Sequence, residues 1–177
     1  MKGQFALIFL GAVLSGCCGL AAPSGLQAVE SFEAERYLGL WYEVARLDHS
    51  FERGLSDVTA TYVARPDGGI EVINRGFHEQ KGEWSEVRGV AYFLENRSLA
   101  SLKVSFFRPL YCGYHVLKID PGYNYAVVSG SDRTALWILA RKPYIPHDIL
   151  AELYHYARQA GFPTGELIEV KHSRHKS

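Results

Sequence analysis

From residue 39 onward, short runs of apolar and β-branched residues alternate with polar turn signals along most of the chain. Runs of this length predict β-strands, and the closely spaced turns predict hairpins between consecutive strands. Two turns have the residues of a chain reversal, Pro66-Asp67-Gly68 and Asp120-Pro121-Gly122. The eight predicted strands cover residues 40–47, 57–65, 69–77, 83–94, 99–107, 113–119, 124–130 and 134–142. The pattern indicates an all-β fold, and hairpin connections favour an eight-stranded up-and-down antiparallel barrel.

A single amphipathic helix follows the strands. Pro146 suits its first turn, Asp148 favours its positively polarised N-terminus, and Gly161 ends it. Its apolar residues at helical spacing are Ile149, Leu150, Leu153, Tyr156, Ala157 and Ala160. We expect this C-terminal α-helix to pack on the outside of the barrel. Residues 166–170 are a candidate ninth strand, and the polar tail 172–177 is expected to be frayed.

The start of the chain is typical of a secretory signal, which takes no part in the fold. Lys2 supplies a positive charge, and the apolar run 5–13 is too short to cross a bilayer as a helix. The segment Leu14-Ser15-Gly16-Cys17 resembles the lipobox of bacterial lipoproteins, whose cysteine sulfur receives a diacylglycerol. A plain signal peptide that is cut after Ala21 is the alternative.

The lipobox divides the chain into a signal peptide (1–16), a lipidated tether (17–30), a barrel domain (31–171) and the polar tail. Two or three acyl chains on Cys17 would anchor the protein stably, whereas a single chain binds a membrane only marginally. The residue after Cys17 is not aspartate. By resemblance to bacterial sorting rules, we expect attachment to the periplasmic face of the outer membrane.

Composition and cysteine content change the picture only slightly. The chain has 19 Lys+Arg and 19 Asp+Glu, so nothing points to nucleic acid as a partner. Aromatic residues make up 13%, which fits a β-rich core or an apolar cavity. Cys18 and Cys112 could pair in an oxidising periplasm, but their positions in the tether and in a distant loop favour two unpaired thiols. No spacing resembles a zinc site, and no cofactor or metal is expected.

Two motifs carry a family resemblance. Gly39-Leu40-Trp41 opens the first strand, and Trp137-Ile138-Leu139-Ala140-Arg141 ends the last one. Together they resemble the signature of the lipocalins, barrels that hold a small apolar ligand, with the arginine stacked on the first tryptophan. Residues 25–171 are most similar to the bacterial outer-membrane lipoprotein lipocalins, which are close to apolipoprotein D. The resemblance implies that fatty acids, lysophospholipids or related molecules are carried, with no catalytic residue.

The sequence departs from the family at one point. Many lipocalins have Thr-Asp-Tyr between strands six and seven, whereas this chain has Ile119-Asp120 and then Tyr123. Asp120 keeps an acid near the closed end of the barrel, where Arg141 could pair with it.

Strand alternation sorts the lining of the barrel from its exterior. An inward Arg141 places Trp137 and Leu139 inward as well. The apolar faces of the fifth and fourth predicted strands add Leu102, Val104 and Phe106, and Gly89, Ala91 and Phe93, with the small residues leaving room for a ligand. Resemblance to apolipoprotein D places three polar groups inside, Tyr62, Asn74 and Tyr114, to orient a ligand. Alternatively, these residues form a simple core, in which the two tyrosines hydrogen-bond each other.

Two connections lie at the expected open end. Residues 48–56 form the longest one and could act as a lid. The apolar loop 107–111 suits contact with the membrane, with a donor protein, or with a second protomer in a homodimer, unless it folds over its own barrel mouth.

Other functions are less well supported. The sequence has neither Gly-x-Ser-x-Gly nor His-Glu-x-x-His, so catalysis is not expected. A haem or metal barrel needs an inward histidine, and alternation places none inside; His115 is expected to face outward. A structural lipoprotein with a filled barrel remains as an alternative to lipid binding and transport in the envelope.

Overall fold

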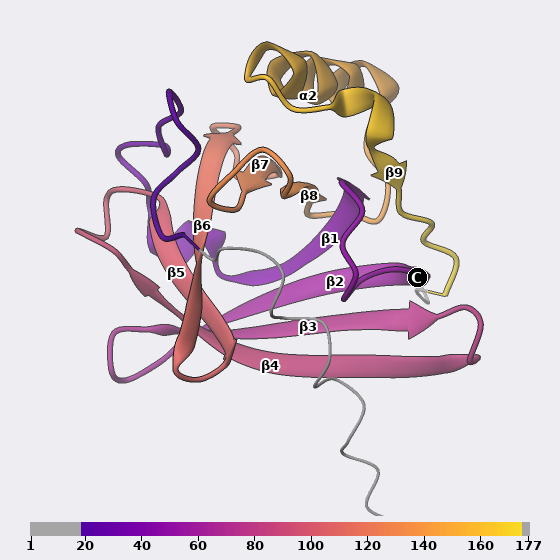
Figure 1. Ribbon diagram of the computed structural model, residues 1–177, viewed down its shortest axis with the longest axis horizontal. Coiled ribbons are helices and arrows are strands. Elements are labelled where there is room, and N and C mark those ends of the chain that lie inside the picture. The colour runs from indigo at the N-terminus through magenta and orange to yellow at the C-terminus, as the bar shows by residue number, and fades with distance from the viewer. Residues whose placement is uncertain (1–18, 175–177) are drawn as a thin grey trace, which may run out of the picture.

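Eight antiparallel strands follow one another around a common axis and close on themselves (Figure 1). The computed structural model describes residues 19–174. The strands are β1 (Gly39–Arg46), β2 (Leu55–Ala64), β3 (Ile70–His78), β4 (Glu83–Phe93), β5 (Ser101–Phe107), β6 (Leu110–Ile119), β7 (Tyr125–Ser129) and β8 (Leu136–Ala140). Closure is complete because β1 pairs with both β2 and β8. This confirms the predicted up-and-down barrel, and a short β9 (Ile168–Glu169) adds to β1.

Two short elements were not predicted from the sequence. The helix α1 (Ala34–Tyr37) has four residues and precedes β1, and the 3-10 turn η1 (Thr164–Glu166) precedes β9. Neither is long enough to display an apolar stripe, so periodicity gives no signal for them.

The closed end of the barrel is organised around Trp41. The guanidinium carbon of Arg141 lies 4.0 Å from the centre of the indole ring, which confirms the predicted stacking. Arg141 also donates hydrogen bonds to the main-chain oxygens of Leu40 (2.8 Å) and Arg36 (2.6 Å). Gly39 has φ +90°, a backbone conformation that glycine adopts without strain.

Asp120 does not pair with Arg141, which instead donates to main-chain carbonyl oxygens. The Asp120 carboxylate accepts hydrogen bonds from the main-chain N–H groups of Asn124 and Tyr125, both at 2.6 Å, and from that of Gly122 at 3.0 Å. It therefore caps the β6–β7 turn, as aspartate commonly does when free N–H groups converge.

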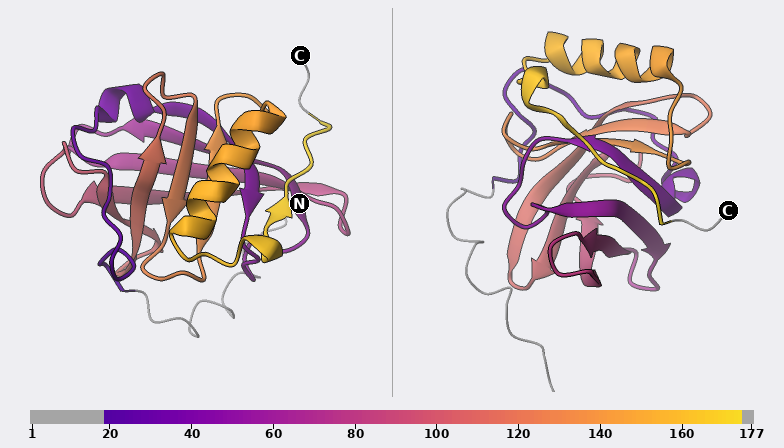
Figure 2. Two further views of the ribbon diagram at one scale, coloured as in Figure 1. Left: turned by 90° about the horizontal axis from the view of Figure 1, so that it is seen from above. Right: turned by 90° about the vertical axis from the view of Figure 1, so that its right-hand side faces the viewer.

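The helix α2 (His147–Gln159) lies across the outer face of the barrel (Figure 2), as predicted. Its buried Leu153 and Ala157 pack against outward-facing strand residues. These include Val44, Leu136 and Ile138. The Tyr156 hydroxyl also donates to the Leu117 carbonyl at 2.8 Å.

Residues 19–33 lie along the barrel. Along β6, pairing with β7 is confined to the second half of the strand. In the first half, Gly113 instead donates its N–H to the Gly19 carbonyl at 2.9 Å. Val29 bridges the wall, donating to Val116 and accepting from Ala100, both at 2.9 Å. Phe32 is buried in the core. The described part of the predicted tether is thus held to the barrel and covers an unpaired strand edge.

Cys112 is disulfide-bonded, so the expectation of a free thiol at this position is wrong. Its partner lies outside the described residues, because residues 19–174 contain no other cysteine. Cys17, Cys18 and the predicted signal peptide all lie outside the described range.

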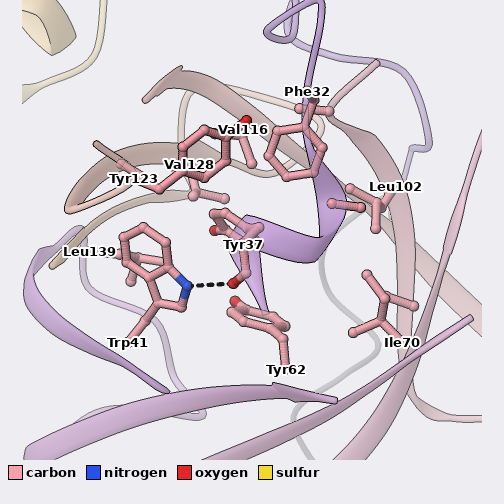
Figure 3. Packing of buried hydrophobic residues seen from close by; sticks show 14 of the residues in the cluster. Phe32, Tyr37, Trp41, Tyr62, Ile70, Leu102, Val116, Tyr123, Val128 and Leu139 are labelled. Atoms are coloured by element: carbon pink, nitrogen blue, oxygen red, sulfur yellow. Dashed lines mark hydrogen bonds between the residues drawn. The ribbon is translucent and has the colours of Figure 1, made fainter. Parts of the chain in front are cut away.

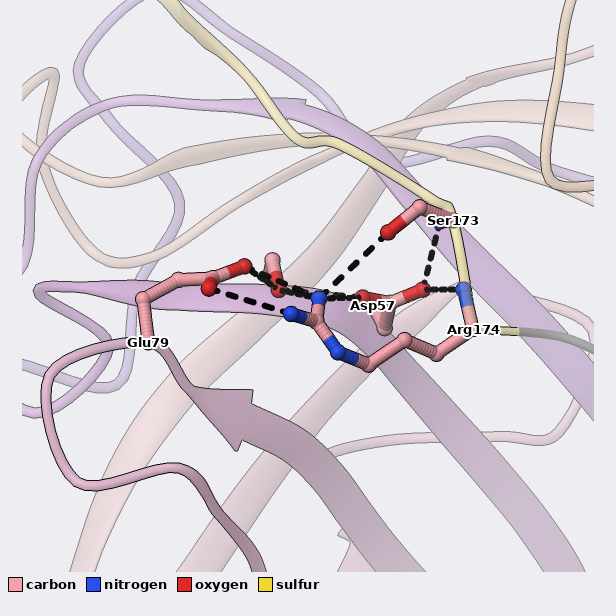
Figure 4. A network of polar contacts seen from close by, with 5 residues as sticks. Asp57, Glu79, Ser173 and Arg174 are labelled. Atoms are coloured by element: carbon pink, nitrogen blue, oxygen red, sulfur yellow. Dashed lines mark hydrogen bonds and ion pairs between the residues drawn. The ribbon is translucent and has the colours of Figure 1, made fainter.

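The C-terminal segment is bound at residues 172–174, where fraying was expected. The Asp57 carboxylate accepts the main-chain N–H groups of Ser173 and Arg174, both at 2.7 Å. The Arg174 side chain then lies between Asp57 and Glu79, 3.0 Å from an oxygen of each (Figure 4). His172 contacts the Glu43 carbonyl at 2.8 Å. Composition alone misses this because a buried carboxylate elsewhere in the chain provides the attachment point.

Candidate functional site: the barrel lumen

The barrel interior is lined mostly by apolar and aromatic side chains (Figure 3). Tyr62, Ala91 and Leu139 are buried in this interior cluster. Phe93, Val104, Tyr114 and Trp137 pack against the same cluster but remain half-buried. Inward residues that keep some exposure are within reach of solvent, so the interior is not completely filled at these positions.

Phe106 takes up room that the sequence assigned to a ligand. A Cβ atom on Gly89 would lie 2.7 Å from the Phe106 ring and 2.6 Å from the Ser105 carbonyl oxygen. The space beside Gly89 is therefore occupied by Phe106, whose side chain is also 39% exposed. The expectation that Gly89 leaves an open space is wrong for this reason.

Three tyrosine hydroxyls meet inside the barrel. The Tyr114 hydroxyl lies 2.6 Å from that of Tyr37 and 2.7 Å from that of Tyr62. The predicted contact between Tyr62 and Tyr114 is present, and Tyr37, which α1 supplies, was missed. Burial raises the pKa of all three, that of Tyr62 to about 12, so they stay protonated at neutral pH. Three protons serve two contacts, which leaves one donor for a further acceptor.

Asn74 adds an acceptor. It lies opposite Ala60 in the β2–β3 ladder, and its buried Oδ1 has no hydrogen-bond partner. Buried polar atoms without partners are uncommon and carry an energetic cost. A ligand donor or a water molecule would satisfy this oxygen.

A charged cluster near the open end was missed altogether. Glu43 and Arg46 lie on β1 opposite the inward Leu139 and Trp137, and the Glu43 carboxylate is 2.8 Å from Arg46 Nη1. Arg46 Nη2 donates to the Glu52 carbonyl at 2.8 Å, and the Trp137 indole donates to the Glu52 carboxylate at 3.0 Å. Glu43, Arg46 and Glu52 are 4%, 2% and 6% exposed. Three ionisable groups are thus enclosed together.

The pKa values of both carboxyl groups are raised, that of Glu43 further than that of Glu52. Burial, and then the proximity of Glu52, raise the pKa of Glu43 well above its usual range. Burial also raises the pKa of Glu52, while the Trp137 hydrogen bond and Arg46 counteract that rise. As the pH falls, Glu43 is therefore the first of the two to take up a proton, and Glu52 keeps its charge beside Arg46 to lower pH.

The loop 47–54, between β1 and β2, covers this cluster. The centre of the His49 ring lies 4.8 Å from that of Trp137, and His49 stacks on Phe51 with 5.4 Å between the ring centres. Burial lowers the pKa of His49, with Arg46 adding to the effect, so the ring is neutral at neutral pH. Strand alternation could not find His49, because it reaches the mouth from a loop. The loop occupies the position expected of a lid.

Part of the cluster was visible in the sequence. Alternation that places Trp41 inward also places Glu43 inward. Arg46 could not be found in that way, because the register shifts between Glu43 and Ala45 and puts both Val44 and Ala45 outward.

Outside the lumen, His115 lies on the face of β6 opposite to Tyr114, as expected, but it is fully buried. Its Nδ1 is 2.9 Å from the Ser101 hydroxyl, and burial lowers its pKa. Within residues 19–174, no three potential metal ligands gather in one place. The described helices include none that is long and apolar enough to span a membrane.

Sequence comparison now identifies the family. A family model described as a lipocalin-like domain matches residues 32–172. The chain belongs to the lipocalin family. It is 49% identical over 166 residues to the outer membrane lipoprotein Blc of Vibrio cholerae, covering 93% of this chain and 96% of that protein. The Escherichia coli K12 protein of the same name is 47% identical over 155 residues, with 88% of each covered.

More distant lipocalins share the barrel. Mouse apolipoprotein D is 34% identical over 133 residues, covering 70% of this lipocalin and 68% of that protein. Insecticyanin from the tobacco hornworm Manduca sexta superimposes with a TM-score of 0.69 at 16% identity, covering 87% of this chain and 88% of that one. At that identity, the structural match establishes the fold alone.

Proposed function

We propose that this lipocalin binds, stores or transports lipids in its lumen, as an outer-membrane lipoprotein on the periplasmic side. The ligand class is fatty acids, lysophospholipids or similar apolar molecules. The observation that carries the proposal is the lumen itself: aromatic and aliphatic walls, partly exposed, with a few polar groups inside. An apolar cavity with convergent polar groups is the usual form of a small-molecule site.

The expected affinity is moderate. Each buried methylene contributes about 0.8 kcal/mol, so ten to twelve methylenes contribute roughly 8–10 kcal/mol. Association costs at least about 4 kcal/mol of this. The remaining free energy of roughly 4–6 kcal/mol corresponds to dissociation constants from about tens of micromolar to about millimolar, which are consistent with reversible carriage.

The lumen is tested by extraction and titration. We expect organic extracts of the purified protein to contain lipid by mass spectrometry, and fluorescent fatty-acid and lysophospholipid probes to bind saturably. Trp137→Phe should weaken binding severalfold, because it removes part of the wall and the hydrogen bond to Glu52. Trp84→Phe is the matched control, since Trp84 is 37% exposed and stacks on Arg75 instead. Absence of both bound lipid and saturable binding would indicate a filled barrel.

The lipid anchor is the second part of the proposal. Its support is the lipobox at Cys17 and the name of the relatives that match over most of the chain. A sulfur in a thioether cannot also form a disulfide, so lipidation of Cys17 makes Cys18 the partner of Cys112. Cys17→Ser should release the protein from membranes into the soluble periplasmic fraction. Non-reducing peptide mapping should join Cys18 to Cys112; a bridge from Cys17 would contradict the anchor.

A further inference from the structure

Arg46 is an unusual residue for the inside of an apolar barrel. It is 2% exposed, and its guanidinium is held by Glu43 at Nη1 and by the Glu52 carbonyl at Nη2. Its third nitrogen, Nε, is buried and has no hydrogen-bond partner. A guanidinium donor without an acceptor in a buried setting is costly, so this atom marks a position where an acceptor is missing.

The guanidinium edge formed by Nε and Nη2, whose Nε has no acceptor, is suited to one kind of group. Nε and Nη2 point their N–H bonds in parallel, and Nη2 carries a second hydrogen beside the one given to Glu52. Carboxylates and phosphates accept such paired donors with both oxygens. A neutral hydroxyl would use only one of the two.

We propose that Arg46 binds the anionic head of the lipid, a carboxylate or a phosphate, near the open end of the lumen. This rests on the proposed lipid-binding function. The acyl chain then extends toward Trp41 and the three tyrosines, and the head lies beneath the 47–54 loop. Trp137, which lies opposite Arg46 on β8, flanks the same position.

Charge balance couples this binding to a proton. The ionisable groups that interact with Arg46 are Glu43 on β1 and Asp48, His49 and Glu52 on the loop. Asp48 is exposed and paired with Arg53, so the buried Glu43 and Glu52 are the enclosed groups that already offset the charge of Arg46. An incoming anion adds one negative charge to this enclosure, which favours protonation of Glu52. Anionic ligands are therefore expected to bind more tightly as the pH falls, and neutral ones are not.

The test compares ligands that have different head groups on the same twelve-carbon alkyl chain. Dodecanoate, dodecyl phosphate and dodecanol are titrated into the full chain carrying Cys17→Ser, so that no attached acyl chain competes. We expect wild-type lumen residues to prefer at least one of the two anions over the alcohol. Arg46→Gln should reduce that preference by about tenfold or more while changing dodecanol binding little, since the charge and the paired hydrogen bonds to the anion are lost. Arg75→Gln, on the exposed outer face of β3, is the matched control.

A second variant covers the case in which Arg46→Gln does not fold. Glu52→Gln keeps the main-chain contact to Arg46 and removes the competing charge. It should increase the preference for the anion and flatten its pH dependence. The two anions separate a fatty-acid head from a phosphate head, and a preference for either supports the proposal.

Three results would overturn the assignment. Equal loss of anion and alcohol binding in Arg46→Gln would mean that Arg46 only shapes the wall. Loss of the anion preference in Tyr114→Phe but not in Arg46→Gln would place the head at the tyrosines. An unchanged preference and pH profile in Glu52→Gln would also refute it. Failure of all three ligands to bind the unsubstituted lumen is a different result, because it rejects the proposed function itself.

Discussion

Single buried charges control much of the chemistry inside this barrel. The Glu43 carboxyl is enclosed by Arg46 and Glu52, and burial holds its pKa well above the ordinary value. A group with a raised pKa in the folded state stabilises the fold fully below its unfolded pKa. That contribution is lost as the pH rises toward the folded pKa.

The pH dependence of unfolding should therefore change in Glu43→Gln. Above pH 4.5, the ordinary value for Glu43, the wild-type chain should lose stability by up to about 1.4 kcal/mol per pH unit from this group. The amide does not ionise, so the advantage of the variant should grow with pH. Urea unfolding at several pH values between 5 and 8 measures this, with exposed Glu83→Gln as control. Parallel curves for wild type and Glu43→Gln would show that the carboxyl is not held protonated.

At the scale of elements, both ends of the described chain are attached to the barrel wall. Residues 19–33 cover the edge of β6, and residues 172–174 bind at the beginning of β2. Asp57 carries the second attachment from a positive φ of 52°. Burial acts to raise its pKa, but hydrogen bonds from Arg174 and Ser173 outweigh that effect and lower it.

Asp57→Asn tests the C-terminal attachment. Asparagine tolerates positive φ, so the substitution removes the charge without adding backbone strain. We expect a loss of about 1–3 kcal/mol in the free energy of unfolding at neutral pH. Because the Asp57 pKa is lowered in the folded state, its contribution is present above the unfolded value and disappears as the pH falls. The wild-type protein and Asp57→Asn should accordingly approach the same free energy of unfolding in acid. A difference that stays constant with pH would show that the Asp57 charge does not hold the C-terminal segment.

Regular elements were predictable and local exceptions were not. Each of the eight strands was found within a few residues because alternation and turn chemistry repeat along the chain, and α2 was found from its stripe. In the lumen, alternation correctly placed Trp137 and Leu139, and family resemblance correctly placed Tyr62 and Tyr114. Arg46, Tyr37 and His49 were missed because a register shift, a four-residue helix and a loop position them. The Cys112 disulfide depends on a path of the chain that spacing does not reveal.

At the scale of the whole molecule, the attachment of residue 19 orients the barrel. Cys17 lies two residues before Gly19, which spans at most about 7 Å. Gly19 contacts Gly113, three residues after Leu110 in the hairpin between β5 and β6. Phe107 and Leu110 in that hairpin are 60% and 48% exposed. A lipid on Cys17 would bring these side chains close to the membrane surface, beside the open end.

The hairpin should therefore affect transfer more than equilibrium binding. Leu110 and Tyr111 both replaced by serine should slow the uptake of a fluorescent lipid from vesicles severalfold in the anchored protein. The dissociation constant for the same lipid in solution should stay within about twofold, because neither side chain lines the lumen wall. Stopped-flow transfer compared with solution titration separates the two effects. Equal uptake rates would show that the hairpin has no role in lipid entry.

Tyr37 has a consequence for the size of molecule that this lipocalin accepts. Its side chain enters the barrel from α1, outside the eight strands. The centre of its ring lies 4.8 Å from that of Trp41 and 5.2 Å from that of Tyr62. It thereby forms the bottom of the lumen. If Arg46 binds the head of the lipid, the distance from Arg46 to Tyr37 sets the longest acyl chain that fits. The preferred acyl-chain length can then change in evolution through substitution of this one residue before the barrel, while every strand and every wall residue stays the same.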